Sequence, residues 1–208
     1  MDPFRFETAP ALRMGAGLGA FPDADLVETL GPRILFVTDR DLIGLGLAAP
    51  ALEAIRRRAQ VLVFDAVEAD PSRETLDAAI AAGRAGAATG VIGFGGGSPM
   101  DVAKLAALRL RSDDFLDDIW GVDKARGPRL PLVLVPTTAG TGSEVTPVSI
   151  ITVGRAEKRG VVSRHLLPNL AILDPDLTLG LPAAVTAATG IDAMVHAIEA
   201  YTSASANN

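Results

Sequence analysis

Apolar runs of four or five residues alternate with amphipathic segments along the first two thirds of the chain. Each run is short, continuous and closed by a polar residue, a proline or a glycine, which is typical of strands buried on both faces of a parallel sheet. The segments between them carry apolar residues three and four positions apart, which predicts helices. The expected strands cover 34–38, 61–64, 91–94 and 132–135, and the expected helices cover 50–59, 71–83 and 99–111. This alternation with short connections predicts a doubly wound, Rossmann-like α/β sheet.

The pattern changes after Pro136, where a long polar loop with two glycines begins. Short β candidates follow the loop, and alanine-rich segments that favour helix come after them. The strand candidates are 148–152, 161–163 and 171–173, and the helical segments are 183–188 and 191–201. We place a domain boundary near 179–181, which gives an α/β domain over 1–180 and the start of an all-helical domain over 181–208.

Composition narrows the class of protein. The 208 residues include 49% hydrophobic residues, enough to fill a core, and carry a net charge of -6. An acidic chain repels phosphate backbones, so we expect no nucleic-acid partner. The absence of cysteine excludes disulfides, thiolate metal sites and a cysteine nucleophile. The chain begins without a signal-peptide pattern, and no apolar run approaches about eighteen residues, so we expect a cytoplasmic protein without a membrane span.

Gly95, Gly96, Gly97 and Ser98 join an expected strand to an expected helix. Glycines at that junction bring backbone N–H groups close to an anion such as a phosphate. The stretch matches neither G-x-G-x-x-G nor the P-loop, because Lys104 lies too far inside the helix. By itself it is as often a tight turn as a phosphate site. The polar loop after the next strand would face it across the same sheet edge, which favours a nucleotide site.

Asp39 closes the first of the four expected strands. A carboxylate there can accept hydrogen bonds from ribose hydroxyls and repel a 2′-phosphate, which favours NAD over NADP. An Asx turn or a helix N-cap explains the same residue equally well. Asp65 ends a strand in a similar way and is interpreted as turn chemistry.

Asp192 and His196 are four positions apart in an expected helix, so they share one face. A carboxylate and an imidazole so placed can bind one divalent ion, although a hydrogen bond between the two side chains is the commoner arrangement. A metal needs at least one more ligand. The other histidine, His165, is interpreted as a surface residue before a turn.

Three segments taken together resemble the iron-containing (group III) alcohol dehydrogenase family. They read GGGSPMD at 95–101, PTTAGTGSEVT at 136–146 and GIDAMVHAIEAY at 190–201. They come in the family's order and near its spacing, and the resemblance runs over nearly the whole chain. The form of the second segment is more similar to the alcohol dehydrogenases than to the glycerol dehydrogenase, maleylacetate reductase or dehydroquinate synthase branches.

The resemblance implies a dehydroquinate synthase-like fold and an enzyme that transfers hydride between a short alcohol or diol and NAD, with an alcohol or aldehyde as its small-molecule partner. The residues it assigns to the cofactor are Asp39, Gly95, Gly96, Gly97, Ser98, Thr137, Thr138, Thr146 and Lys158. It implies that Asp192 and His196 are catalytic and are the first two of four metal ligands. In the role that the resemblance implies, the ion, iron(II) or zinc, would polarise the substrate hydroxyl and stabilise the alkoxide that gives up hydride to NAD.

Two departures from the family pattern matter. Asp70 stands before Pro71 where the family usually has asparagine, which removes one expected cofactor contact. The family also draws two further histidines from a larger helical domain, so a non-catalytic nucleotide-binding fragment and a related branch of glycerol dehydrogenase or maleylacetate reductase type stay open as alternatives. We expect the final helix to expose apolar side chains and to favour association, for example as a homodimer. The 208 residues by themselves are expected to be inactive as an enzyme.

Overall fold

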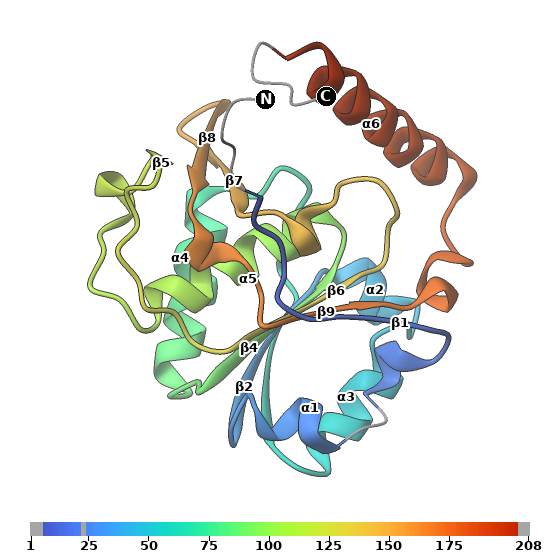
Figure 1. Cartoon of the computed structure of the whole chain (residues 1–208). Coiled ribbons are helices and arrows are strands. Elements are labelled where there is room, and N and C mark those ends of the chain that lie inside the picture. Colours follow the sequence, from blue (N-terminus) through green and yellow to red (C-terminus); the bar gives the residue numbers. More distant parts are fainter. Residues whose placement is uncertain (1–5, 22–23, 204–208) are drawn as a thin grey trace.

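The computed structural model describes residues 6–21 and 24–203, and its centre is a six-stranded sheet (Figure 1). All neighbouring strands run parallel. Their order across the sheet is β1 (Leu12–Met14), β9 (Leu170–Leu173), β6 (Leu132–Pro136), β4 (Gly90–Gly95), β2 (Arg33–Val37) and β3 (Gln60–Phe64). The predicted doubly wound α/β fold is therefore confirmed.

Helices cover both faces of this sheet (Figure 1). Alternate strand residues point to opposite faces: Ile34 and Phe36 belong to one apolar cluster, Leu35 and Val37 to the other. The first cluster includes residues of α1 (Ala24–Glu28), α2 (Arg40–Gly44) and α3 (Ala49–Arg56), and the second includes residues of α4 (Arg73–Ala85) and α5 (Gly97–Arg109). Burial on both faces explains why the strands read as continuous apolar runs.

The strand order reverses between β2 and β4. From β2 the chain moves outward to β3, returns to the other side of β2 as β4, and then continues outward through β6 to β9. In such sheets a crevice opens at the carboxyl ends of the two strands where the direction changes. Asp39 follows one of these ends and Gly96 follows the other, so the fold brings the two predicted features together.

A small second sheet lies against α4 and α5. Its strands, in spatial order, are β5 (Gly121–Val122), β8 (Glu157–Val162) and β7 (Val148–Val153). The strands expected at 148–152 and 161–163 belong here, whereas the one expected at 171–173 is β9 of the main sheet. The hydrophobic pattern does not predict β1, because Leu12 and Met14 are exposed on a three-residue edge strand. Short 3₁₀ helices complete the chain: η1 (Leu18–Ala20), η2 (Leu116–Asp118), η3 (Ser143–Val145), η4 (Arg164–Leu166) and η5 (Pro175–Thr178).

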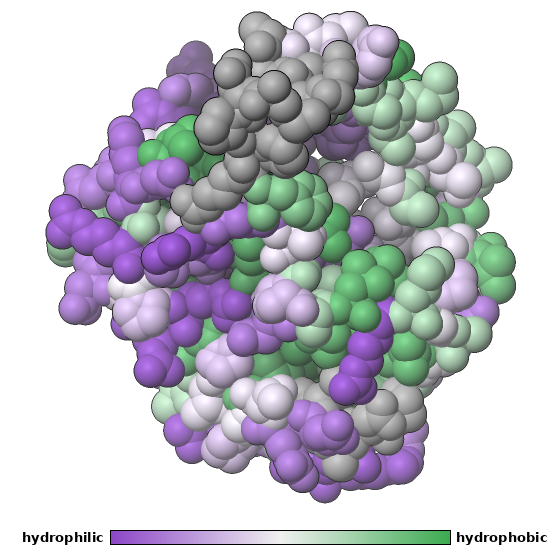
Figure 2. Space-filling model, viewed as in Figure 1, coloured by the Kyte–Doolittle hydropathy of each residue, from purple (hydrophilic) through white to green (hydrophobic). Residues whose placement is uncertain are grey.

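The last helix, α6 (Ala183–Thr202), is continuous, which corrects the expectation of two segments broken at Gly190. A glycine costs a helix only about 1 kcal/mol, too little to end one among so many alanines. None of the α6 residues is buried, and apolar residues show as green along it in Figure 2. The predicted exposure is confirmed at Ile191, Met194, Val195 and Ile198, and Tyr201 is exposed as well. Within residues 6–21 and 24–203 no helix has the length and apolar character needed to cross a membrane. The boundary at 179–181 falls between η5 and α6 and stays a prediction.

Candidate functional site

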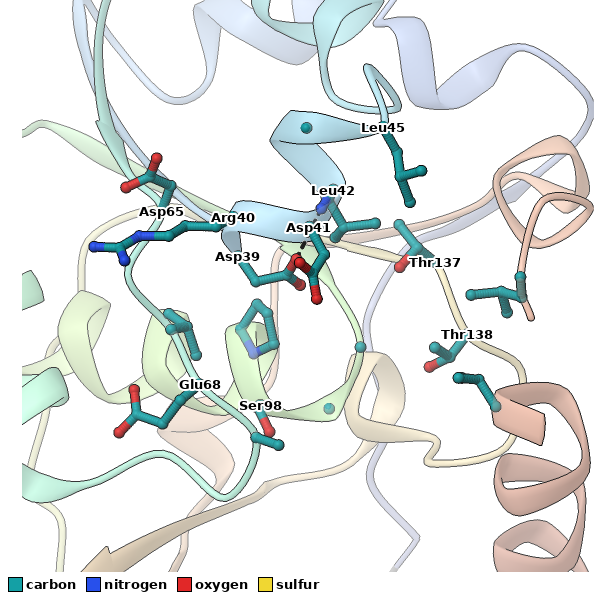
Figure 3. Close-up of a pocket in the computed structure, with 18 of the residues that line it drawn as sticks. Asp39, Arg40, Asp41, Leu42, Leu45, Asp65, Glu68, Ser98, Thr137 and Thr138 are labelled. Carbon is teal, nitrogen blue, oxygen red and sulfur yellow. Dashed lines mark hydrogen bonds between the residues drawn. The ribbon is translucent and has the colours of Figure 1, made fainter. Parts of the chain in front are cut away.

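A pocket of about 870 Å³ lies at the carboxyl ends of β2 and β4, where the strand order reverses (Figure 3). Its walls come from the start of α2, the segment 65–69 after β3, the start of α5, the loop after β6 and the start of α6. Six residues predicted for the cofactor line this one pocket: Asp39, Gly96, Gly97, Ser98, Thr137 and Thr138. The structure thus joins segments that are about a hundred residues apart in the sequence.

The N-terminus of α5 opens into this pocket. Gly96 is the N-cap residue, and no side chain caps the helix there. Helix geometry leaves the N–H groups of Gly97 and Ser98 without partners inside α5, and Pro99 has none to offer. A Cβ at Gly96 would come to 3.6 Å from the Thr138 side chain. A side chain at Gly96 would therefore enter the space between the helix and the loop opposite.

Thr138 faces that space with an unused hydroxyl. Its Oγ1 is buried and has no hydrogen-bond partner in the structure. The neighbouring Thr137 is held in place because its N–H donates to the carbonyl of Gly95 at 2.9 Å. A buried, unpaired hydroxyl is costly unless a ligand completes its bonding. Free helix N–H groups on one wall and this hydroxyl on the other suit a phosphate or pyrophosphate.

Asp39 has both of the roles that its sequence position left open. One oxygen, Oδ1, accepts the N–H of Leu42 at 2.9 Å, so Asp39 is the N-cap of α2. The same side chain lines the pocket, beside Asp41 (Figure 3). Burial raises the pKa of the Asp39 carboxyl above its ordinary value, partly opposed by the bond from Leu42. A carboxylate fixed in this way still has an oxygen for a ribose hydroxyl.

Sequence reasoning missed several charged residues of the pocket. Arg40, Asp41, Asp65 and Glu68 line it in addition to Asp39. Asp65, which the sequence pattern assigns to a turn only, follows β3 as Asp39 follows β2. The sequence contains a signal for Asp65, because this residue directly follows a predicted strand and the ends of neighbouring parallel strands meet at one edge of the sheet. Four carboxylates against one guanidinium make this end of the pocket acidic.

Three residues assigned to the cofactor lie outside the pocket lining: Gly95, Thr146 and Lys158. Gly95 has a φ of +150°, and a Cβ there would meet Pro99 at 2.7 Å, so this glycine lets the chain turn into α5. Lys158, on β8, forms an exposed ion pair with Asp70, Nζ to Oδ1 at 2.6 Å. The aspartate that replaces the family's asparagine therefore holds this lysine. The cofactor roles of all three residues stay predictions.

A polar cluster that the sequence did not reveal joins α5 to residues 143–150. Lys104 has no exposed surface and donates to Ser143 Oγ at 2.9 Å and to the carbonyls of Thr146 at 3.0 Å and Val148 at 2.7 Å. Burial lowers the pKa of Lys104 to about 8, although Asp101 opposes the shift. Burial likewise raises the pKa of Asp101.

On α6, Asp192 Oδ1 and His196 Nε2 lie 3.6 Å apart, and both side chains are partly exposed. This confirms that they share a helix face. Residues 6–21 and 24–203 contain no group of three or more histidines, aspartates or glutamates placed to hold a metal. Asp192 and His196 by themselves supply fewer donors than a catalytic zinc ion takes, which is three protein ligands and a water.

The loop after β6 comes close to α6 at Gly140. A Cβ at Gly140 would lie 2.1 Å from the carbonyl oxygen of Thr189, and Gly140 has a φ of +150°. Only glycine permits backbones this close. The loop that lines the pocket thus meets α6 three residues before Asp192.

Residues 17–175 match the family model described as iron-containing alcohol dehydrogenase. The chain belongs to this family. It is 42% identical over 186 residues to long-chain-alcohol dehydrogenase 1 of Geobacillus thermodenitrificans (strain NG80-2). The matched region covers 87% of this chain and 47% of that protein.

Solved structures of iron-containing alcohol dehydrogenases and their relatives share the fold. A crystal structure of 1,3-propanediol oxidoreductase matches with a TM-score of 0.93 at 34% identity, over 99% of this chain and 55% of that one. Sulfoacetaldehyde reductase from Bifidobacterium kashiwanohense, solved in complex with NAD⁺, matches with a TM-score of 0.86 at 34% identity, over 97% and 54%. The chain spans about half the length of these relatives.

Proposed function

We propose that this chain forms the dinucleotide-binding part of an NAD-dependent, divalent-metal-dependent alcohol dehydrogenase that interconverts a short alcohol or diol and its aldehyde. The observation that carries the proposal is the pocket where the strand order reverses, which has an uncapped helix N-terminus on one wall and the unpaired hydroxyl of Thr138 on the other. That chemistry fits a pyrophosphate. Membership of the family and the NAD⁺ complex of a relative support the choice of dinucleotide.

In this proposal each wall of the pocket has a separate task. The N–H groups of Gly97 and Ser98 bind the pyrophosphate, and Thr138 donates its hydroxyl to the same group. Asp39 accepts hydrogen bonds from the adenosine ribose and repels a 2′-phosphate, which selects NAD over NADP. When bound, NAD supplies the hydride chemistry. The chain's own residues bind it and orient it.

Asp192 and His196 are proposed as ligands of iron(II) or zinc. Two donors fall short of the ligand number of a catalytic ion, so we expect these residues alone to bind metal weakly and to show little or no turnover. A protein with the complete ligand set would oxidise alcohol with NAD in a metal-dependent way.

The test has two stages. The chain is titrated with NADH and with NADPH, and binding is measured by the fluorescence of the reduced nicotinamide. Binding should be saturable, and NADH should bind more tightly than NADPH. Metal-supported oxidation of short primary alcohols and diols is then measured in the protein with its complete ligand set and in its Asp192→Ala and His196→Ala variants. These variants should keep the NADH affinity and lose turnover. Full activity in both variants would remove the metal assignment, and absence of NADH binding would remove the proposed function.

A further inference from the structure

A cation lies at the end of the pocket around Asp39, which the proposed function assigns to the adenosine. Among the described residues that line the pocket, Arg40 is the one positively charged side chain. An arginine beside the adenosine ribose is the group that accommodates the 2′-phosphate in sites that take NADP. A pocket that selects NAD must therefore keep this guanidinium away from the ribose.

Arg40 and Asp65 lie close together because the chain segments that follow β2 and β3 are paired. Asp39 forms an isolated antiparallel bridge with Ala66, and Arg40 and Asp65 are the residues next to this bridge. Figure 3 shows the Arg40 side chain extended on the Asp65 side of the pocket, away from the carboxylate of Asp39. Arg40 makes no direct ion pair with any residue that the structure describes, so the attraction between Arg40 and Asp65 acts between separated charges.

The other carboxylates at this end of the pocket are placed for other tasks. Both oxygens of Glu68 accept hydrogen bonds from the start of α4. Asp39 caps α2, and its pKa is raised by burial and also by the negative charge of Asp41. The Asp65 carboxylate has no hydrogen-bond donor among the described residues, which leaves its charge to act on Arg40.

We propose that Asp65 is a positioning residue for cofactor specificity: it attracts the guanidinium of Arg40 away from the adenosine ribose, so that a 2′-phosphate lacks the one cation that could bind it. The inference rests on the proposed function, because it takes the ribose to lie beside Asp39. In this arrangement Asp39 repels the 2′-phosphate directly, whereas Asp65 acts through Arg40. Exclusion of NADP therefore has two separable parts.

The test is a double-mutant cycle of Asp65→Asn and Arg40→Met. Dissociation constants for NADPH and NADH are measured at low ionic strength by the fluorescence of the reduced nicotinamide. Asp65→Asn should tighten NADPH by about fivefold, the gain of one solvent-screened charge contact, and change NADH by less than about twofold. This gain should disappear in the double variant. Arg40→Met alone should change the ratio of the two affinities by less than about twofold.

Asp41→Asn is the matched control, because it removes the same charge from the same end of the pocket. Any effect of Asp41→Asn on NADPH affinity should be equal with and without Arg40→Met, since Asp41 acts on the phosphate directly. Thermal melts check that each variant is folded. If Asp65→Asn does not fold, Asp65→Ser takes its place in the cycle.

Three results would overturn the role of Asp65. They are an unchanged NADPH affinity in Asp65→Asn, a gain that survives Arg40→Met, and a selective loss of NADPH affinity in Arg40→Met alone, which would place Arg40 at the 2′-phosphate already. Each of them leaves NADH binding by the wild type, and with it the proposed function, standing. Absence of NADH binding in the wild type would overturn both.

Discussion

Replacement of Gly140 by alanine should separate cofactor binding from hydride transfer. The new Cβ would lie 2.1 Å from the carbonyl oxygen of Thr189, so the loop and α6 must move apart by about 1.3 Å to reach the 3.4 Å at which ordinary contact begins. The φ of +150° adds backbone strain of about 1–3 kcal/mol for a residue with a side chain. Because α6 carries Asp192 and His196 within the next two turns, the displacement is passed on to the proposed metal ligands.

A displacement of about 1 Å between reacting groups costs on the order of 10²-fold in rate. We therefore expect metal-supported turnover in the protein with its complete ligand set to fall by about that factor in Gly140→Ala. NADH affinity should fall by no more than about tenfold, since Thr138 on the displaced loop is a single proposed contact, whereas the helix N-terminus of α5 and Asp39 are untouched. Amides of α6 should also exchange hydrogen faster, which reports the loosened contact without any need for activity.

Two glycines nearby are matched controls. Gly142 also has a positive φ, +64°, but a Cβ there has nothing within 4 Å, so Gly142→Ala adds strain without displacing α6. Gly190 lies in α6 next to Thr189 with open space around it, and Gly190→Ala should stabilise the helix by about 0.5–1 kcal/mol. If Gly140→Ala matches Gly142→Ala in turnover and in hydrogen exchange, the contact with Thr189 does not set the position of α6.

Three further predictions concern single charged residues. Asp39→Ala should lower the free energy of unfolding by about 1 kcal/mol, measured by urea unfolding, because it removes the N-cap bond of α2. It should also shift the ratio of NADPH to NADH affinity toward NADPH by on the order of tenfold, measured by titration, and an unchanged ratio would assign Asp39 to capping alone. Because the pKa of Lys104 is lowered from 10.5 to about 8, its charge penalises the folded state below pH 8, and the penalty is relieved as pH rises toward 10.5. The unfolding free energy should therefore rise by up to about 1.4 kcal/mol per pH unit in that window relative to Lys104→Met, and equal slopes in denaturant melts would contradict it. Asp70→Asn should cost little stability, because asparagine also tolerates the φ of +54° and the exposed ion pair with Lys158 is worth less than about 1 kcal/mol. It frees Lys158 and should therefore tighten NADH binding, whereas an unchanged NADH affinity would place Lys158 outside the cofactor site.

The main sheet and the position of the pocket could be predicted because both follow from local patterns. A strand buried on both faces must be continuously apolar, so the strands at 34–38 and 91–94 could be recognised from their apolar runs. The glycines after β4 and the carboxylate after β2 mark strand ends, and parallel strand ends meet at one edge. Among the strands of the main sheet, only β1 was not predicted, because an exposed strand of three residues has no hydrophobic pattern to detect.

The candidate site was only partly predictable for a different reason. Asp101 and Lys104 are three apart on α5, where Lys104 is buried and Asp101 is partly exposed, and this spacing does not show what they bind. Their partners lie about forty residues further on, and the partner of Lys158 lies 88 residues back. Side-chain hydrogen bonds over such separations depend on how the elements pack, which no local pattern records.

The sequence by itself determined the fold class, the edge of the sheet where Asp39 and the glycines after β4 meet, and the helix face shared by Asp192 and His196. The tertiary structure decided which predicted residues meet: it gathered Asp39, Gly96 and Thr138 in one pocket, paired Lys158 with Asp70 outside it, and brought Gly140 against α6. Strands and helices are selected by forces between near neighbours in the chain, whereas a binding site is assembled by the packing of distant ones.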